Sequence, residues 1–501
     1  MSMAEALTAL KMELLQQVVP QVLQQVEDAL REGRPVHELE RGLWELLLQT
    51  GRRAVGTFLE AHGSGDLGPT LTLADGTGVR RLDGLHRRRY VSPFGEFTLR
   101  RAVYGSREGQ AVAFVPLDNR LQLPAGPFSY LLQDWDQALA VEQAFGQVSA
   151  TVERMLGLRQ SVDSLEGMNR QMAAEVGWFR DLQPAPPPAE EGQVVVVTAD
   201  CKGVVIRGQG TKAVCGGQRP GGVRANQKQM ATVGAVYTVD RYVRTPAAVV
   251  AALFRDPGHE PGPRPVPCHK HVWGSLAEAG PQPRSSIAVT FDWLTWEYAQ
   301  RNPRLERPAV YLCDGQEALW QACDDLPQAN AVPILDLLHV TPRLWQAAKL
   351  LYGERGAEVV PFVRRRVLQI LEGQVDGVLR ALPRLAAARG LRGAKKKALA
   401  RIGAYLRKNR HRMRYDAYLA AGYPIASGVI EGACRHLVKD RMERAGMHWT
   451  VEGAQAMLDL RSVYIAGQWQ TYQAYWVEAE TERLYPHRRV VAGEAFFALA
   501  A

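Results

Sequence analysis

Hydrophobic positions at the start of the chain recur with the spacing of helices. The apolar side chains from Leu15 to Val26 follow one another at intervals of four, three and four residues. This pattern predicts a helix over residues 4–31, which Pro20 must kink or divide. Its apolar side serves either a core or a dimer contact, and a core helix is the simpler interpretation. A second helical pattern covers 38–62 and ends at a Gly-rich turn.

The pattern then changes to strand-like alternation and back. Residues 70–117 alternate apolar and polar positions between Gly breaks, which predicts a small antiparallel sheet. Its arginines are Arg80, Arg81, Arg87, Arg88, Arg89, Arg100 and Arg101. From 126 to 181 three helical runs follow, and we expect Ser149 and Ser161 to open the second and third helices. A helix-turn-helix and an ordinary three-helix bundle fit this pattern equally well.

Beyond a Pro-rich linker at 183–192, continuous β-branched runs predict strands inside a sheet. These strands are expected at 194–200, 203–207, 231–244, 308–315 and 331–340, with a short helix from 316 to about 326. Basic helices follow over 341–424, and a last helix is expected over 427–444. The fold class is therefore α/β, with a helical insertion before the last helix.

These patterns divide the chain into eight segments. They are an N-terminal helical region (1–68), a small β-rich basic region (69–125), a helical region of helix-turn-helix type (126–182), the linker (183–192), the first part of the α/β domain (193–345), a basic helical insertion (346–424), the last helix of the α/β domain (425–465) and a C-terminal tail (466–501).

Composition narrows the class of protein. Hydrophobic residues make up 46% and charged residues 23% of the chain, which is ordinary for globular proteins, and no apolar run is long enough to span a membrane. The first residues lack the features of a secretory signal, and the six cysteines form no CxxC pair. We therefore expect a cytoplasmic protein without a disulfide framework.

Several common catalytic motifs are absent from the sequence. It contains no P-loop, HExxH or GxSxG pattern, which argues against an ATP-driven helper, a zinc protease and an α/β-hydrolase. Cys268, His269 and His271 hint at zinc, but no second ligand pair stands at a suitable spacing.

The net charge of +9 becomes informative when the positions of the charged residues are considered. Residues 380–414 contain thirteen Lys or Arg and no Asp or Glu, so this stretch alone exceeds the net charge of the chain. Such a run is either a solvated helix face or a contact for phosphate, and its density favours nucleic acid. The cations expected to bind DNA there are Lys395, Lys396, Lys397, Arg407, Lys408, Arg410, Arg412 and Arg414.

Two aspartates stand at the ends of predicted buried strands. Asp200 closes one strand and Asp314 follows another, and each has a Gly soon after it. Strand ends are where α/β sheets place side chains for ligands, and a shared divalent cation relieves the repulsion between close carboxylates. Taken singly, each is weak evidence, because a turn Asp that caps the next helix is the commoner reason for an Asp before Gly.

The helix expected over 427–444 has two unlike faces. One is apolar and carries Ile430, Ala433 and Leu437, and the other is charged and carries Glu431, Arg435 and, with some drift, Lys439. Glu431 lies one turn from Arg435, so the two form either an exposed ion pair or a metal ligand beside a phosphate-binding cation. In the second case Glu431 completes a three-carboxylate site.

The C-terminal block PIASGVIEGACRHLVKDRMERAGMHWTVEGAQAMLDLRSVYIAGQW (424–468) resembles the signature of the ISKra-four family of bacterial insertion-sequence transposases. TADCKG and YLCDGQEALW resemble the two Asp segments of that family, and the resemblance spans roughly residues 85 to 475. It implies an RNase H-like catalytic domain, with the Asp–Asp–Glu set at Asp200, Asp314 and Glu431. LDLLHV is similar to the C/D-x-x-H motif of Mutator-like relatives, which makes Asp336 and His339 active-site candidates beside the structural alternative of a strand-end Asp and a half-buried His.

The resemblance implies a DNA transposase that uses two Mg²⁺ or Mn²⁺ ions held by Asp200, Asp314 and Glu431. Such an enzyme cuts the ends of an insertion sequence and joins the freed 3′-hydroxyl to target DNA. Its partners would be double-stranded DNA at the element ends and at the target, not a membrane, and we expect a homo-oligomer acting on the nucleoid. The alternatives are a non-catalytic DNA-binding protein and an RNase H-like nuclease that cuts without joining.

Two stretches rich in Gly, Pro and cations, 207–230 and 255–287, lie between the two aspartates. They are expected to form loops over the site that approach a phosphate backbone closely, or in part to be long disordered loops.

Overall fold

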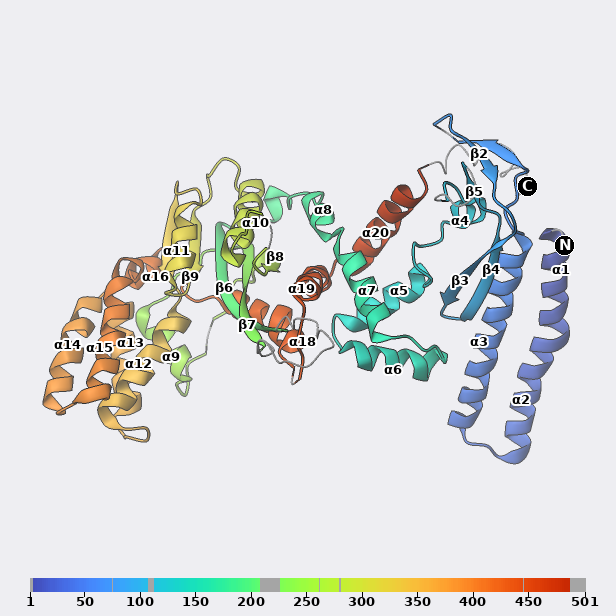
Figure 1. The fold of residues 1–501 in the computed structure, drawn as a ribbon. Helices are drawn as coiled ribbons and strands as arrows, with labels where there is room; N and C mark the ends of the chain where they lie inside the picture. The colour runs from blue at the N-terminus through green and yellow to red at the C-terminus, as the bar shows by residue number, and fades with distance from the viewer. Residues whose placement is uncertain are drawn as a thin grey trace, which may run out of the picture. The chain divides into compact units, whose positions relative to one another are not determined.

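The computed structural model describes residues 3–73, 75–106, 112–207, 226–260, 262–278, 281–444 and 446–486. The chain forms two compact units, the first comprising Met1–Glu175 with Trp469–Ala501 and the second Val176–Gln468 (Figure 1). Among the described residues, no helix is both long enough and apolar enough to cross a membrane.

Unit 1 begins with a long helical hairpin. Its first arm consists of α1 (Met3–Glu13), a π-helical segment (Leu14–Val18) and α2 (Val19–Glu32), and its second arm is α3 (Val36–Ala61). The π-helical segment ends two residues before Pro20, which has no N–H to donate. The change of hydrogen-bonding pattern here divides the helix predicted over 4–31.

The β part of unit 1 follows. β1 (Thr70–Thr72), β2 (Gly78–Arg81) and β5 (Tyr104–Gly105) form an antiparallel sheet, and β3 (His86–Ser92) pairs with β4 (Gly95–Arg101) in a separate hairpin. The strands predicted over 70–117 end at Gly105 among the described residues, and α4 (Pro116–Leu121) begins where the last strand was expected. Arg88 and Arg101 both pair with the buried Asp118, so these two arginines hold the fold together.

Three helices complete unit 1 together with the returning C-terminal helix. α5 (Tyr130–Ala140), α6 (Phe145–Leu156) and α7 (Val162–Ala173) pack against one another, and α20 (Trp469–Leu484) packs on α5. Ser161 caps α7 as predicted. The prediction for Ser149 is wrong, because α6 begins earlier, with the Gln147 side chain accepting from the Ala144 N–H, and Ser149 lies inside the helix.

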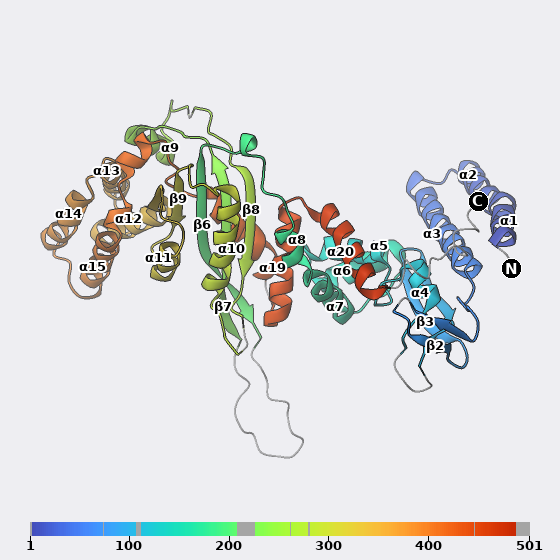
Figure 2. The same ribbon diagram turned by 90° about the horizontal axis from the view of Figure 1, so that it is seen from above.

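The centre of unit 2 is a five-stranded mixed sheet, so the chain is an α/β protein. Its strands are β6 (Val194–Ile206), β7 (Gln227–Val239), β8 (Cys268–Ser275), β9 (Ala309–Cys313) and β10 (Ala331–Leu335), in the spatial order β10-β9-β6-β7-β8. β6, β9 and β10 are parallel, whereas β7 is antiparallel to both β6 and β8. Figure 2 shows β6, β7 and β8 side by side with α10 (Ser286–Arg301) lying along them.

Two strand predictions need correction. The strands expected at 194–200 and 203–207 are one strand, because β7 pairs with β6 along its whole length. The strand expected at 331–340 ends at Leu335, and α12 (Leu337–Tyr352) begins after Asp336, whose side chain caps it.

Different helices cover the two faces of the sheet. Trp273 of β8 contacts Trp293 of α10, with ring centroids 5.8 Å apart, and lies opposite Gly234 of β7. Asp200 lies opposite the adjacent residue, Val233, and therefore points to the other face. That second face is covered by the helical stretch made of α17 (Gly428–Ala433), a π-helical segment (Cys434–Lys439) and α18 (Asp440–Met442), and by α19 (Val451–Ile465).

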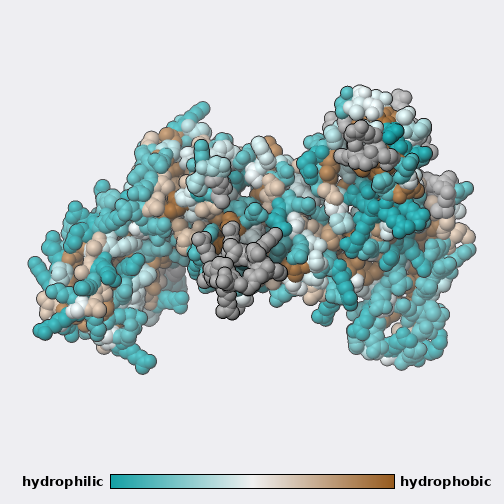
Figure 3. Space-filling model, viewed as in Figure 1, coloured by the Kyte–Doolittle hydropathy of each residue, from teal (hydrophilic) through white to brown (hydrophobic). Residues whose placement is uncertain are grey.

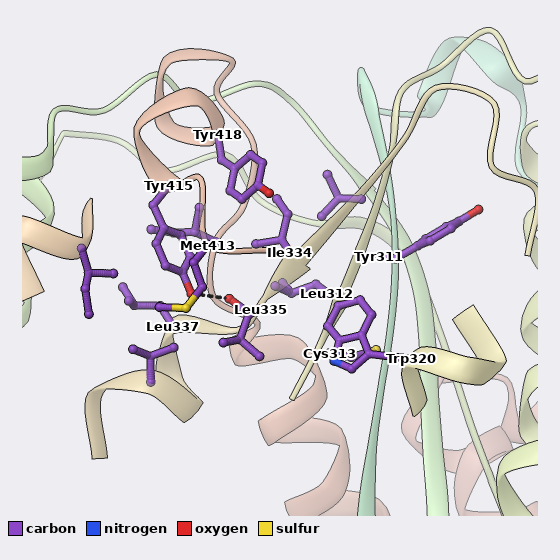
Figure 4. Packing of buried hydrophobic residues seen from close by; sticks show 14 of the residues in the cluster. Tyr311, Leu312, Cys313, Trp320, Ile334, Leu335, Leu337, Met413, Tyr415 and Tyr418 are labelled. Atoms are coloured by element: carbon purple, nitrogen blue, oxygen red, sulfur yellow. Dashed lines mark hydrogen bonds between the residues drawn. The ribbon is translucent and has the colours of Figure 1, made fainter. Parts of the chain in front are cut away.

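α11 (Glu317–Asp324) follows β9, and most of the other helices of unit 2 form a lobe beside β10. They are α9 (Pro246–Phe254), α12, α13 (Val359–Leu371), α14 (Val375–Ala388), α15 (Gly393–Lys408), a 3₁₀ turn (Arg410–Arg412) and α16 (Tyr415–Ala420). The basic segment 341–424 is helical as predicted. Figure 4 shows how its end joins the sheet: Tyr415 donates a hydrogen bond to the Leu335 carbonyl at 2.6 Å, and Met413 and Tyr418 pack nearby.

The segment between α8 (Val176–Asp181) and β6 is anchored to the sheet domain. It includes a 3₁₀ turn (Pro188–Glu190), and the next residue, Glu191, accepts two hydrogen bonds from Arg301 of α10 at 2.6 and 2.7 Å. Both side chains are almost fully buried. The pair fixes the end of the segment that was predicted to be a linker, because a buried charge without its partner is costly.

Candidate active site

Asp200 and Asp314 lie next to each other at one edge of the parallel strands. Ala199 of β6 pairs with Cys313 of β9, and each aspartate is the following residue. Adjacent residues at the same register of parallel strands point to the same face. The sequence placed Asp200 at a strand end, but β6 continues to Ile206, so Asp200 instead marks the end of the portion that β9 covers.

Local hydrogen bonds orient both carboxylates. Asp314 Oδ1 accepts from the Gln316 N–H at 2.7 Å, and Asp200 Oδ1 accepts from the Cys201 N–H at 2.7 Å. Burial raises the pKa of Asp314, and the charge of Asp200 raises it further, while His339 and Arg343 act in the opposite direction. The two carboxylates are therefore close enough to repel each other.

Glu431 reaches the same face from the helix that covers it. Ser427 caps α17 by accepting from the Ile430 N–H, and the predicted two faces of the helix are confirmed. Ile430, Ala433 and Leu437 are buried, whereas Glu431, Arg435 and Lys439 are exposed. One turn beyond Glu431, Cys434 Sγ lies 3.6 Å from Asp200 Oδ2, which joins this helix to the first aspartate.

The π-helical segment Cys434–Lys439 has a visible cause. The buried Arg461 of α19 donates to the carbonyl oxygens of His436 and Leu437, the latter at 3.0 Å. A side chain that takes up backbone carbonyls in this way widens a helical turn. Such turns are frequent at functional sites.

His339 stands between the second and third carboxylates. Its Nε2 is 3.2 Å from Glu431 Oε1, and its Nδ1 is 3.8 Å from Asp314 Oδ2. The predicted association of His339 with these residues is therefore present in the structure. When protonated, the imidazole compensates both negative charges.

Asp336 has a different position from the one a catalytic group would take. It is buried, and its two oxygens accept from the backbone N–H groups of Leu338 at 2.7 Å and Ser427 at 3.0 Å. Asp336 thus ties the start of α12 to the residue that caps α17. In this structure it positions His339 and Glu431.

An open cleft of about 590 Å³ lies beside these residues. Asp314, His339 and Glu431 line it, together with two residues that the sequence analysis did not single out, Arg343 and Tyr405. The Arg343 guanidinium lies over the Tyr405 ring, 4.9 Å from its centroid. Arg343 follows His339 by four residues, a helical spacing that the sequence did not reveal because the strand was expected to run to residue 340, which placed His339 in the strand and Arg343 in the helix after it.

The donor set fits a hard divalent cation. Asp200, Asp314 and Glu431 offer carboxylate oxygens, the preferred ligands of Mg²⁺ and Mn²⁺, and repulsion between the two aspartates is what such an ion relieves. In the part of the chain that the structure describes, no three Asp, Glu, His or Cys side chains surround a common point closely enough to hold a metal as they stand. Glu431 is instead held by His339.

The basic stretch divides into solvated and engaged cations. Lys395, Lys396 and Lys397 of α15 are exposed, as are Arg407 and Arg414. Lys408 pairs with Glu317 at 2.7 Å, Arg410 pairs with Asp376 at 3.0 Å, and Arg412 stacks 4.0 Å above the Trp320 ring. The surface over α14 and α15 is mostly hydrophilic on the face seen in Figure 3.

The structure also shows where most of the other residues singled out by the sequence lie. Arg435 lies 3.5 Å from Asp440, and Lys439 is exposed. In the CHKH segment, His269 and His271 approach Glu190 and Glu297 at 3.4 and 2.6 Å, so these histidines serve ion pairs. Most of the loop predicted at 207–230 lies outside the described residues, and the segment 255–287 contains β8.

Comparison with known proteins adds no relative. No protein-family model matches the chain, and a search of curated proteins found no matching sequence.

Proposed function

We propose that this chain is a DNA transposase that cuts and joins DNA strands with the carboxylates of Asp200, Asp314 and Glu431. One observation carries the proposal: two aspartates at adjacent strand positions point to one face of the sheet, and Asp314 lines an open cleft there together with Glu431 of the covering helix. The sheet, with three antiparallel strands followed by two parallel ones, is compatible with the RNase H-like fold that the sequence resemblance implies.

The chemistry of a phosphodiester explains the residues around the cleft. The reacting phosphate is anionic and its leaving group is poor, so positive charge must be supplied on both sides of the phosphorus. Two Mg²⁺ or Mn²⁺ ions held by the three carboxylates would activate the attacking hydroxyl and stabilise the leaving oxygen. Arg343 is placed to contact a non-bridging phosphate oxygen, and its stacking on Tyr405 holds its guanidinium in position.

His339 has a role of its own in this proposal. It lies 3.2 Å from Glu431, and that carboxylate would have to leave His339 before it could hold a metal ion. Asp336 would keep the start of α12, which carries His339, tied to the cap of α17, which carries Glu431.

The surfaces for DNA follow from charge and exposure. The exposed cations of α15 and Lys439 would contact the phosphate backbone of element ends and target without reading their sequence. We assign sequence recognition to unit 1, where α5, α6 and α7 pack together as in a helix-turn-helix or a three-helix bundle.

We also propose that the protein acts as a homo-oligomer through its N-terminal hairpin. Leu15, Leu23 and Leu30 lie along one side of the first arm and are 57%, 57% and 79% exposed. An apolar stripe of this kind is covered when two hairpins pack as a four-helix bundle. Sedimentation of the L15E/L23E variant, expected to be monomeric, tests this assignment.

The catalytic assignment is tested with Asp200→Ala, Asp314→Ala and Glu431→Gln. Each variant should abolish cleavage of element-end DNA while DNA binding stays nearly intact, because the exposed cations are unchanged. Glu358→Gln, which alters an exposed carboxylate immediately before α13, is the control and should cleave normally. Near wild-type cleavage by any of the three variants would remove that residue from the site.

A strand-transfer assay distinguishes an enzyme that joins DNA from one that only cuts it. Pre-cut element ends carrying a free 3′-hydroxyl should be inserted into plasmid DNA by the wild-type chain in Mg²⁺. Cleavage without any insertion would identify a nuclease instead of a transposase.

A further inference from the structure

A second hollow, of about 490 Å³, lies next to the cleft. Its apolar wall comes mainly from α9 and from the start of α12, and its polar rim comes from the segment after β7 and the loop after α9. The apolar lining includes Val249, Ala252, Leu253, Leu337 and Ile425, and the polar lining includes Tyr242, Arg244, His259 and Arg264. None of these residues belongs to the carboxylate site.

The two hollows are neighbours separated by one side chain. Leu338 lines both, while Leu337 faces the second hollow and His339 faces the carboxylate cleft. These three residues are consecutive in the first turn of α12. The two hollows therefore adjoin at the first turn of α12.

The polar rim is built rigidly. Arg244 donates from Nη2 to the Tyr423 carbonyl at 2.8 Å and from Nε to the Tyr242 carbonyl at 3.2 Å, and its guanidinium lies 5.3 Å from the centroid of the Tyr242 ring. Gly422 has a φ of +74° and approaches the Tyr242 backbone so closely that a Cβ would lie 2.8 Å from its nitrogen. Tyr242 and Arg244 are thus fixed before any ligand binds.

The lining of this hollow carries more positive than negative charge, with Arg244 and Arg264 against Glu260. Burial lowers the pKa of Arg244. The positive charge of Arg264 lowers it further, so the two guanidinium groups lie close enough to repel each other. Within the described ranges, neither arginine forms an ion pair with a carboxylate, although Glu260 also lines the hollow. Two neighbouring arginines without an acidic partner are suited to bind phosphate.

We propose that this hollow receives one unpaired nucleotide of the DNA strand that passes through the carboxylate cleft, with its base against Tyr242 and the apolar wall and its phosphate at Arg244 and Arg264. The proposal rests on the proposed function. A base stacked inside a duplex cannot enter a hollow beside the strand, so the nucleotide must leave the stack. The volume suits one nucleotide, since small-ligand sites hold about 300–1,000 Å³.

The test uses the full chain and two single-stranded probes of equal charge. One is an eight-residue thymidine oligonucleotide, and the other has the same backbone with every base removed. Base stacking on an aromatic side chain contributes about 1–3 kcal/mol, so we expect roughly tenfold tighter binding of the thymidine strand. Fluorescence anisotropy of end-labelled strands measures both affinities.

Three variants separate the contribution of the base to binding from that of the phosphate. Ala252→Trp and, independently, Leu253→Trp fill the apolar part and should remove the preference for the thymidine strand. Leu253 is 41% exposed, so its replacement leaves the core untouched. Arg264→Ala should weaken both strands by a similar factor of about five to ten, because it removes a phosphate contact. Lys270→Ala, an exposed cation on β8, is the matched control and should change neither affinity.

Equal wild-type affinity for the two strands, or a preference that survives both Trp variants, would overturn the inference and leave the proposed function standing. Loss of single-strand binding restricted to Lys270→Ala would equally overturn it. A chain that binds no DNA and cuts none would overturn both proposals together.

Discussion

Asp136 is a carboxyl group that folding takes entirely out of water. Its Oδ2 accepts from Gln160 Nε2 at 2.8 Å, while its Oδ1 has no hydrogen-bond partner among the described residues. Burial raises the pKa of Asp136 to about 7. The folded state therefore holds a proton that the unfolded state loses near pH 4, and unit 1 loses stability as the pH rises from about 4 to about 7.

Asp136→Asn should remove most of that pH dependence. At pH 8 we expect the variant to be more stable than the wild type by about 1–3 kcal/mol, because the neutral amide keeps the acceptor without a buried charge. Urea unfolding at pH 5 and pH 8 measures the effect. Asp163→Asn, which changes an exposed residue of α7, should retain the wild-type dependence, and a destabilised Asp136→Asn at pH 8 would contradict the argument.

Arg343 extends the proposed site beyond its carboxylates. Arg343→Ala should lower the cleavage rate by about 10- to 100-fold with little change in DNA affinity, because one preorganised cation at the reacting phosphate acts mainly in the transition state. Arg343→Lys should recover part of the rate. Arg365→Ala, an exposed arginine of α13, serves as the control. If binding and cleavage fell in equal proportion, Arg343 would be a simple anchor for DNA.

At the scale of elements, α15 carries the free cations of the basic stretch. Reversing Lys395, Lys396 and Lys397 to Glu should weaken binding to element-end and random duplexes alike. Three lost phosphate contacts should lower the slope of log K against log salt concentration by up to about 2.7. Reversal of the exposed Lys11 and Arg41 in unit 1 is the control. An unchanged slope would make the α15 surface a solvated face.

The elements also show how far the sequence predicts this fold. The spacing of hydrophobic residues predicted the core strands and the two faces of the last helix, because a strand or helix face can be buried only if its residues have that spacing. It divided β6 wrongly, since Lys202 and Gly203 look like a turn while their pairing with Ala231 and Met230 keeps them in a strand. That pairing involves a strand about thirty residues away, which local patterns do not report.

The residues of the candidate site could be predicted from the sequence to about the same extent as the fold. Asp200, Asp314 and Glu431 each stood out by position in an element, and the structure brings them to one face. Arg343 and Tyr405 come together only when α12 and α15 pack, so spacing along the chain held no sign of that pair. Helical spacing from His339 would have indicated Arg343, had the expected strand ended at Leu335 instead of residue 340.

On the scale of the whole molecule, the chain forms two compact units. Unit 1 is closed by α20, where Trp469 donates to Asp134 at 2.7 Å, so its chain is not contiguous. In unit 2, one large cluster of buried residues joins the sheet to the helical lobe. Each unit should therefore unfold as its own cooperative transition.

Calorimetry of two matched variants tests this division. Leu132 of unit 1 and Leu344 of unit 2 are both completely buried. Leu132→Ala should lower the midpoint of one transition and Leu344→Ala that of the other, each through a loss of about 2–5 kcal/mol. A single transition shifted by both variants would show that the units unfold together.

The π-helical segment after Glu431 has a consequence for gene sequences that encode this helix. A π turn contains one residue more than an α turn, so an in-frame loss of one codon within residues 434–439 would leave a regular α-helix. Because the π turn takes up its extra residue locally, the helix beyond the deletion would keep its rotation relative to Glu431. Arg461 would nevertheless lose the carbonyls of His436 and Leu437 that it now occupies. A variant one codon shorter should therefore still fold, with a loss of stability that comes from the carbonyl contacts of the buried Arg461.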